Sequence, residues 1–322
     1  LDSFVFNGSI IKEFDDTLSM YEDGDVSSNE NFSKASIVAS VDKYYVNTIY
    51  DFDKTLQGVI SIYKGEDALV FVKIANSQSL NGYIGEKNYA KLAKISKELT
   101  DVIDYGFITF FAKPLFEFLV YINSYLHNWG WAIIVLTIII KILVFPLTYK
   151  GMMSMGRLKE LSPLVKEIQA KHKDDPAKSG AAMMALYKKH DASPMGGCLP
   201  ILLQIPVFFA IYRVLLNAVE LKGAEWLLWI NDLSLYDPYY VLPILMGASM
   251  FVQQLITPTT ITDPTQQKIF KFLPVVFTIF FLSFPAGLVL YWIVNNVLSI
   301  VQQYYINKKL EWNKQMRDEN KK

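Results

Sequence analysis

Hydrophobic positions divide the chain into two parts. Residues 1–107 are polar and mixed, whereas nearly all the long apolar runs lie within 108–306. In the first part, short runs rich in β-branched and aromatic residues are separated by turn residues, which is typical of strands. The runs predict an antiparallel sheet or a β-sandwich, and they occupy 35–41, 44–50, 58–63 and 68–74.

After these runs, apolar residues recur at helical spacing. Residues 88–102 have apolar positions on one side among lysines, which predicts an amphipathic helix that closes a first domain at 1–103. The following segment, 104–128, is aromatic but is interrupted by charged residues and a proline. We interpret it as a helix that lies along a membrane surface.

The second part contains apolar runs that resemble membrane spans, with a core at 129–306. The run at 272–284 is short, because its 13 residues reach only about 20 Å as a helix. A span this short implies a locally thinned bilayer. We therefore predict a polytopic α-helical membrane protein with five transmembrane helices, at about 129–149, 199–220, 239–258, 272–284 and 286–306.

Charge gives these spans a direction, although the net charge is zero. Residues 1–107 carry 10 lysines against 17 acidic residues, whereas 150–195 carry 9 basic against 5 acidic residues. The tail, 307–322, carries 6 basic against 3 acidic residues. Because basic loops stay in the cytoplasm, we expect a cytoplasmic helical hairpin at 151–194 and a cytoplasmic tail. An odd number of spans then puts residues 1–128 on the opposite side.

Lys141 is a cation inside the first apolar span. A charge there costs at least about 2.5–3.5 kcal/mol on insertion scales, so it marks a candidate functional site. The other spans carry no Asp or Glu in their interiors that could neutralise it. Thr137, one helical turn earlier, shares its face. Two interpretations remain open: Lys141 extends to the cytoplasmic surface, or it faces a water-filled cavity.

The last span has a polar stripe at spacings of three to four residues, formed by Trp292, Asn296, Ser299 and Gln303 with Asn295 beside them. Such stripes often join membrane helices to one another. Together with Lys141 and the mid-span Gln204, the stripe also fits a shared hydrophilic groove. Both interpretations stay open from the residues alone.

Motifs for catalysis are lacking. The chain has no His-Glu-x-x-His, no Gly-x-Ser-x-Gly and no Walker-type loop. Its single cysteine, Cys198, excludes an internal disulfide. The basic segment 151–194 lacks interleaved aromatic residues for base stacking, so DNA is not an expected partner. We expect no enzymatic reaction, no metal and no cofactor.

Several motifs, in order along the chain, resemble those of the bacterial YidC membrane protein insertases, which are related to the mitochondrial and chloroplast insertases. The resemblance covers about 104–303, and residues 1–103 look like the later part of that family's periplasmic β-domain. The motifs include Asn128-Trp-Gly, Phe145-Pro-Leu-Thr148, Pro194-Met-Gly-Gly-Cys-Leu-Pro200, Gln204-Ile-Pro206, Asp237-Pro-Tyr-Tyr and Phe284-Pro-Ala-Gly-Leu-Val-Leu-Tyr-Trp292.

The resemblance implies an insertase and chaperone of the bacterial inner membrane, with a positively charged hydrophilic groove. Nascent membrane proteins would be its clients, and it would work alone or with the Sec translocon. Lys141 falls where the family usually has an arginine, and Thr137, Tyr291 and Trp292 fall where the family touches nascent segments. The hairpin at 151–194 would contact clients, the ribosome or the signal-recognition receptor.

Other classes of function remain as alternatives. A small-anion transporter or channel would use Lys141 to bind its solute, but it predicts inverted repeats, and the sequence shows none. A scaffold that only holds Sec components would not insert proteins by itself. The groove residues expected for an insertase are Lys141, Thr137, Gln204, Tyr291, Trp292, Asn295, Asn296 and Ser299.

Overall fold

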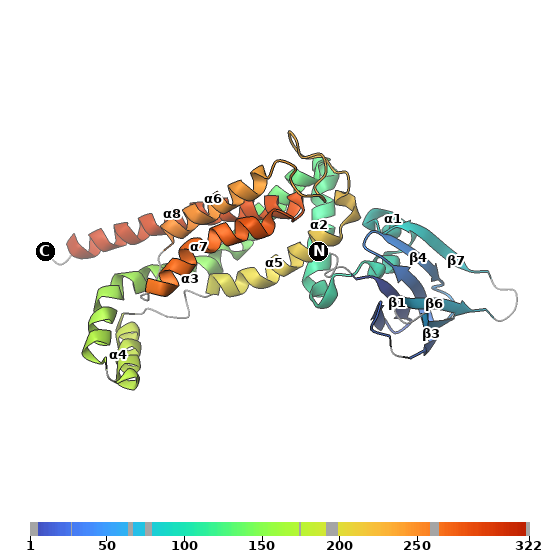
Figure 1. Ribbon diagram of the computed structural model, residues 1–322, viewed down its shortest axis with the longest axis horizontal. Coiled ribbons are helices and arrows are strands. Elements are labelled where there is room, and N and C mark those ends of the chain that lie inside the picture. Colours follow the sequence, from blue (N-terminus) through green and yellow to red (C-terminus); the bar gives the residue numbers. More distant parts are fainter. Residues whose placement is uncertain are drawn as a thin grey trace. The chain divides into compact units, whose positions relative to one another are not determined.

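The computed structural model forms two compact units, which we describe separately (Figure 1). The first unit extends to Phe110 and includes Arg213–Lys222, and the second comprises Phe111–Tyr212 and Gly223–Lys322. The structure describes residues 6–26, 28–63, 67–74, 79–173, 175–190, 199–257 and 264–319. Cys198 and the end of the predicted hairpin, 191–194, lie outside these residues.

The first unit is built on one antiparallel sheet of seven strands. The long strand β3 bonds to β1 and β4 along its second half and to β5 along its first half. The predicted antiparallel sheet is therefore confirmed, and β3, whose register shifts between Phe32 and Ala35, links all seven strands by hydrogen bonds. The strands are β1 Gly8–Glu13, β2 Leu18–Glu22, β3 Glu30–Val41, β4 Tyr45–Tyr50, β5 Leu56–Tyr63, β6 Asp67–Lys73 and β7 Asn81–Glu86.

A small apolar core holds the sheet together. Gly58 makes a close approach possible, because a Cβ there would lie 3.2 Å from both Ile11 Cδ1 and Val38 Cγ2. Apolar side chains from four strands meet at this point, where little area remains exposed. The buried members of this core are Ile11, Ala35, Val38, Leu56, Ile60 and Ala68.

The predicted helix at 88–102 is broken at Ser96. The structure has α1 at Tyr89–Ile95 and a 3-10 helix at Lys97–Val102. Ser96 has an extended backbone, and its hydroxyl accepts a hydrogen bond from the Glu98 N–H at 3.2 Å, which starts the second helix. The break rotates Ile95 into solvent, where 44% of its surface is exposed.

A buried and a half-buried charged residue, Lys87 and Glu220, belong to the first unit. Lys87 is 4% exposed, and burial lowers its pKa to about 8, against the opposing attraction of Asp42 and Asp104. Glu220 accepts a hydrogen bond from the Tyr89 N–H at 2.7 Å. Burial raises the pKa of the Glu220 carboxyl.

The second unit is a bundle of helices. Within it, α8 packs against α3 and α6, α6 packs against α7, and the end of α3 packs against α4. Figure 1 shows α2 running across the direction of the bundle helices. The helices are α2 Thr109–Leu126, α3 Trp129–Lys171, α4 Pro176–Lys189, α5 Leu199–Asn217, α6 Val241–Ile256, α7 Pro264–Phe281 and α8 Ala286–Glu319. The residues of α5 from Arg213 onward belong to the first unit.

Helix boundaries differ from the predicted ones. Helix α3 has 43 residues and joins the predicted span 129–149 to the first arm of the hairpin. Helix α4, the second arm of the predicted hairpin, begins at Pro176, where the Asp175 side chain caps it. Helix α7 begins at Pro264, eight residues before the predicted short span, and α8 carries the predicted tail as helix up to Glu319.

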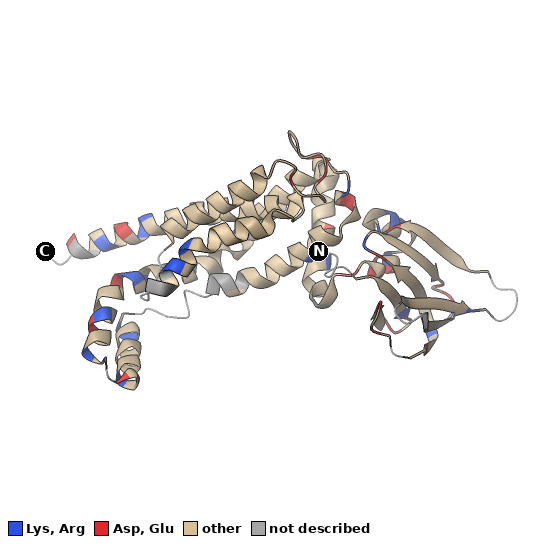
Figure 2. Ribbon diagram, viewed as in Figure 1, with Lys and Arg blue, Asp and Glu red and all other residues tan. Residues whose placement is uncertain are grey.

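Two of the described helices, α3 and α8, are long and apolar enough to cross a membrane. Residues Gln204–Asn217 and helix α6 form shorter apolar helices. The structure therefore supports two of the five spans predicted from the apolar runs by helix length and composition. Figure 2 shows that the charged residues of the second unit gather on the hairpin and at the end of α8, while the middle of the bundle carries few.

The linker between α5 and α6 ties the helix starts of the bundle together. The Asn128 side chain donates to the carbonyls of Glu225 at 3.3 Å and Trp226 at 3.4 Å. Gly130 leaves room for the Trp226 ring, since a Cβ there would lie 2.0 Å from its Cδ1. At the other helix, the N–H groups of Ala286 and Gly287 donate to linker carbonyls. The linker thereby satisfies donors at the N-termini of α3 and α8.

Candidate functional site

Lys141 turns toward α8. Its Nζ donates to the Ser299 hydroxyl at 2.8 Å, and that hydroxyl donates in turn to the Asn295 carbonyl at 2.8 Å. In the ranges that the structure describes, Lys141 makes no ion pair with a carboxylate. A neutral hydroxyl satisfies one donor but does not cancel the charge. The ammonium is thus held between helices and remains uncompensated.

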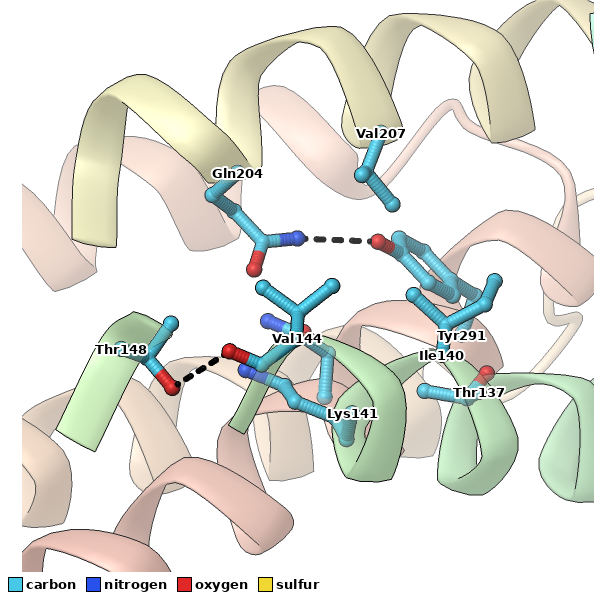
Figure 3. A pocket seen from close by; sticks show the side chains of 9 residues that line it. Thr137, Ile140, Lys141, Val144, Thr148, Gln204, Val207 and Tyr291 are labelled. Atoms are coloured by element: carbon cyan, nitrogen blue, oxygen red, sulfur yellow. Dashed lines mark hydrogen bonds between the residues drawn. The ribbon is translucent and has the colours of Figure 1, made fainter. Parts of the chain in front are cut away.

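A small cavity borders Lys141 between α3, α5 and α8 (Figure 3). Its volume is about 20 Å³, which is room for about one water molecule. This space is far smaller than an open groove. The cavity is lined by Thr137, Ile140, Lys141, Val144, Thr148, Gln204, Val207, Tyr291 and Asn295.

Polar contacts close the cavity on the α5 side. The Gln204 amide donates to the Tyr291 hydroxyl at 3.1 Å (Figure 3), and Tyr291 is 2% exposed. The Thr137 hydroxyl donates to the Ile133 carbonyl at 2.6 Å, as Ser and Thr often do within helices. The Thr137 hydroxyl therefore lines the cavity as a hydrogen-bond acceptor, because its proton is bonded to the Ile133 carbonyl. Two side chains, Lys141 and Gln204, contribute the polar hydrogens that face other helices.

The predicted polar stripe on α8 divides between neighbours. Ser299 and Asn295 face Lys141, whereas the Asn296 amide donates to the Ser249 hydroxyl of α6 at 3.0 Å. The Trp292 ring packs against Phe208, with 4.9 Å between ring centroids, and against Phe281 at 5.4 Å. Five of the eight predicted residues thus line the cavity, and Ser299 adjoins it through its hydrogen bond with Lys141. Trp292 and Asn296 lie at helix packing interfaces.

Trp292 carries a buried donor, because its indole nitrogen has no acceptor among the residues that the structure describes. A buried donor without an acceptor costs free energy, so such a group is unusual in the core of a folded protein. The nitrogen lies within an aromatic cluster of α5, α7 and α8, outside the Lys141 cavity.

The cavity wall also contains residues that the sequence patterns did not single out. Ile140 and Val144 flank Lys141, and Val207 follows Gln204 by three residues. Thr148, seven residues after Lys141, also lines the cavity, as its position on the helix face of Lys141 predicts. Helical spacing from Lys141 and Gln204 is the signal that could have found them. Ser249 carried no such signal, because its contact with Asn296 depends on how α6 packs against α8.

An apolar helical bundle with an uncompensated lysine, together with a separate antiparallel sheet domain, defines an integral membrane protein with an extramembrane domain. Comparison with known families agrees with this class. Residues 121–315 match the family described as 60Kd inner membrane protein, and residues 3–118 match the YidC periplasmic domain. The chain belongs to the YidC family, which confirms the resemblance seen in its motifs.

Similar proteins carry the same family name. A "Membrane protein insertase YidC" of Wolinella succinogenes is 58% identical over 313 residues, covering 96% of this chain and 58% of the relative. One of the same name from Helicobacter pylori is 54% identical, covering 100% of this chain and 59% of the relative. The chain thus spans less than two thirds of the length of these relatives.

A solved structure supports the fold. The crystal structure titled "Active YidC insertase crystal structure with the first transmembrane domain resolved" has a TM-score of 0.53 and 20% sequence identity. The similarity covers 94% of this chain and 75% of that one. At this identity the comparison establishes the shared architecture of sheet domain and helical membrane region.

Proposed function

We propose that this protein is a membrane protein insertase and chaperone. It inserts and folds nascent transmembrane segments through a positively charged hydrophilic groove between α3, α5 and α8. The names of its relatives support this activity. The single observation that carries it is Lys141, a cation that bonds to a hydroxyl and keeps its charge available.

The proposed first step is an exchange of partners at Lys141. A client presents an acidic or polar segment, and its carboxylate replaces the Ser299 hydroxyl. Two unit charges 4 Å apart attract by about 4 kcal/mol at an effective dielectric constant of 20. A hydrogen bond to a charged group contributes about 1.5–3 kcal/mol, so a client carboxylate competes with the Ser299 hydroxyl for Lys141. The attraction lowers the cost of taking the client's polar segment out of bulk water.

In the second step, the client's apolar segment moves along the groove wall into lipid. Thr137, Tyr291 and Trp292 line this route in the proposal. Transfer of apolar surface out of water drives release, and no nucleotide is consumed. The 20 Å³ cavity is then the closed state, which widens when a client enters.

The proposed topology has five helices crossing the bacterial inner membrane, namely α3, α5, α6, α7 and α8. The sheet domain and α2 lie on the periplasmic side, and the hairpin and the end of α8 lie in the cytoplasm. The surface of α2 supports its proposed position along the membrane surface, because one face of the helix is buried and the exposed face is apolar. Its exposed large residues are Phe110, Phe111, Phe118, Tyr121, Tyr125 and Leu126.

The proposed partners are nascent membrane proteins, lipid and components of the Sec translocon. On the cytoplasmic side, the hairpin is proposed to contact the ribosome or the signal-recognition receptor. A cavity of about 560 Å³ between the hairpin and the end of α8 supports a docking role. It includes Met153 and Met316, and methionine side chains adapt to varied partners.

Substitution of Lys141 tests the charge role. Lys141→Ala is expected to reduce insertion of a single-span client with an acidic external tail by about tenfold or more, since each 1.4 kcal/mol is a factor of ten. Lys141→Arg keeps the positive charge and is expected to retain most insertion. The measurement is client insertion into vesicles that contain the purified protein and lack Sec, which also separates an insertase from a scaffold.

Ser299→Ala is the matched control, because it removes the partner of Lys141 but leaves the cation in place. It is expected to insert the acidic client at near-normal yield. A client with a neutral tail is expected to be indifferent to all three substitutions. Full insertion of the acidic client by Lys141→Ala would remove the basis for the charge role. Anion flux through the same vesicles would instead favour a transporter.

A further inference from the structure

The linker between α5 and α6 exposes an unusual amount of apolar surface. Leu228 is 77% exposed and Tyr239 is 68% exposed. Clustered exposed apolar residues mark a surface that contacts something other than water. The six exposed residues, called the linker patch below, are Leu227, Leu228, Leu235, Tyr236, Tyr239 and Tyr240.

The linker holds these side chains outward in a fixed conformation. Ile230 N–H donates to the Leu227 carbonyl at 3.1 Å, and Trp226 N–H donates to the Ile230 carbonyl at 3.0 Å. Between them, Leu228 adopts a left-handed backbone with φ of 56°. Leucine rarely adopts this region, so the conformation costs free energy and directs a leucine into the surroundings.

The anchors of the linker lie underneath the patch. Ile230 is 3% exposed and Leu233 is fully buried, so the linker packs on the bundle through alternate residues. Tyr240 repeats the feature seen at Leu228, with φ of 57° and 43% of its surface exposed. Packing within the bundle does not account for two strained, apolar and exposed positions in one linker.

The depth of the linker follows from its hydrogen bonds. It bonds at one side to Asn128, directly before α3, and at the other side to Ala286 and Gly287, the first residues of α8. The N–H of Ala286 donates to the Leu235 carbonyl at 2.7 Å. Both helices are apolar from their first turn and long enough to span a bilayer. In the proposed topology, a linker bonded to both starts lies at the boundary between hydrocarbon and headgroups.

Charge also favours a lipid boundary over water. Residues 223–267 contain no Lys or Arg. Of the three acidic groups in residues 223–240, Asp237 is 1% exposed and is satisfied by three donors, Asp232 bonds to Ser234, and Glu225 alone is exposed. Tyrosine has an apolar ring and a polar hydroxyl, which is why it is enriched where a membrane meets water.

We propose that the linker patch inserts into the periplasmic leaflet of the bilayer. Leu227 and Leu228 enter the acyl edge to a depth of about 5–10 Å, as the apolar faces of interfacial segments do. The tyrosine hydroxyls of the patch stay among the headgroups. The partner is a phospholipid surface, and the contact fixes the depth of the α3 and α8 starts. The inference rests on the proposed topology.

Fluorescent labels at single cysteines test this, with the full chain in lipid nanodiscs and Cys198→Ser as background. The probe position is Leu228→Cys. Ile84→Cys on β7, which is 81% exposed, is the water-facing control. Val297→Cys, 47% exposed and 11 residues into α8, is the mid-bilayer control at about 16 Å of helix.

The expected result is a blue-shifted emission at position 228 with strong quenching by lipids brominated near the headgroup. Quenching by iodide in water is expected to be lost at 228 and kept at 84. Iodide quenching at 228 equal to that at 84 would overturn the inference, and so would shielding from both quenchers, which indicates a protein partner. Failure of deep bromines to quench 297 would instead refute the membrane topology itself.

Discussion

Asp237 is a buried carboxylate with three donors around it. One oxygen accepts from the Trp229 indole and the Tyr239 N–H, both at 2.9 Å, and the other accepts from the Leu242 N–H at 2.7 Å. Asp237→Ala leaves these donors buried without a partner. We expect a loss of about 2–3 kcal/mol in the free energy of unfolding, since each such group costs about 1–3 kcal/mol.

Thermal unfolding in detergent micelles, followed by tryptophan fluorescence, measures this loss. Asp232→Ala is the matched control in the same linker, because Asp232 is half-buried and, among the described residues, accepts hydrogen bonds from Ser234 alone. Its substitution is expected to have a much smaller effect. Equal destabilisation by the two variants would contradict the role assigned to Asp237.

Lys87 makes the stability of the first unit depend on pH. Its pKa falls from 10.5 to about 8 in the folded protein, chiefly because of burial. As pH falls from 10.5, the unfolded chain binds this proton first, so the folded state loses stability until about pH 8. The full loss is roughly 3 kcal/mol at 1.36 kcal/mol for each pKa unit.

Lys87→Met is expected to remove that slope and to stabilise the unit at neutral pH. The measurement is calorimetric unfolding of the full chain between pH 7 and 10.5. Lys91→Met is the control, because Lys91 is exposed and pairs with Glu86 at 2.7 Å. If Lys87→Met keeps the same pH slope as the parent, the buried cation is not its source.

For single residues, sequence patterns predict candidate functional residues better than they predict the hydrogen-bond partners of those residues. Lys141 stands out because a charge in an apolar run is costly to insert and is seldom present without a role. Its bond to Ser299 depends on how α3 and α8 cross, and no spacing along one helix contains that information. The same packing turns Asn296 away from Lys141 toward Ser249, although a helical stripe groups it with Ser299.

Between elements, the contact of α6 with α7 depends on Gly247. A Cβ at this position would lie 1.9 Å from the Thr278 hydroxyl oxygen, so any larger residue must push the helices apart. Gly247→Ala is expected to destabilise the bundle by about 1–3 kcal/mol, as overpacked cores generally are. The measurement is the unfolding temperature in detergent.

Gly180→Ala in α4 is the matched control, because nothing lies within 4 Å of its added Cβ. Alanine favours a helix over glycine by up to about 1 kcal/mol, so this variant is expected to be neutral or slightly stabilised. Gly247→Ala behaving like Gly180→Ala would show that α6 and α7 can separate at no cost.

The existence of most elements follows from the sequence, whereas their ends do not. Each of the apolar runs predicted as spans overlaps a helix, but α5 ends at Asn217, α7 ends at Phe281, and α3 continues into polar sequence until Lys171. Apolar periodicity reports burial or lipid contact, and it stops where a helix enters water. Strand β7 has no clear signal in the sequence, because its short segment, with two glycines, becomes a strand through pairing with β4.

For the whole molecule, the proposed topology puts the sheet domain and the hairpin on opposite sides of the membrane. Cysteines at Ile84 on β7 and Met184 on α4, both well exposed, report the side of each. In spheroplasts, a membrane-impermeant maleimide is expected to label position 84 at once and position 184 only after lysis. Immediate labelling of both positions would reverse one end of the topology.

Architecture at this scale can largely be predicted from the sequence, because the polar half and the apolar half differ in period and charge. The motifs add the family, which the matches over 3–118 and 121–315 establish. The arrangement of the strands cannot be predicted in this way. It depends on β3 pairing with β5 before Ala35 and with β1 and β4 after it, which is a property of three dimensions.

The bond between Lys141 and Ser299 sets the order of events in the proposed insertion, because it links client binding to the contact between two helices. In the proposed mechanism, the Lys141 ammonium that binds a client carboxylate is also the group that bonds α3 to α8, so client binding and the loss of this contact occur together. In the proposed mechanism, a client without an anion leaves the bond between Lys141 and Ser299 in place, so its insertion does not depend on this bond. The hydrogen bond contributes about 1.5–3 kcal/mol, roughly a 10- to 150-fold bias toward the bonded state, so a client carboxylate readily replaces the hydroxyl. In this mechanism the contact between α3 and α8 is released by the client carboxylate itself, and no nucleotide hydrolysis is needed.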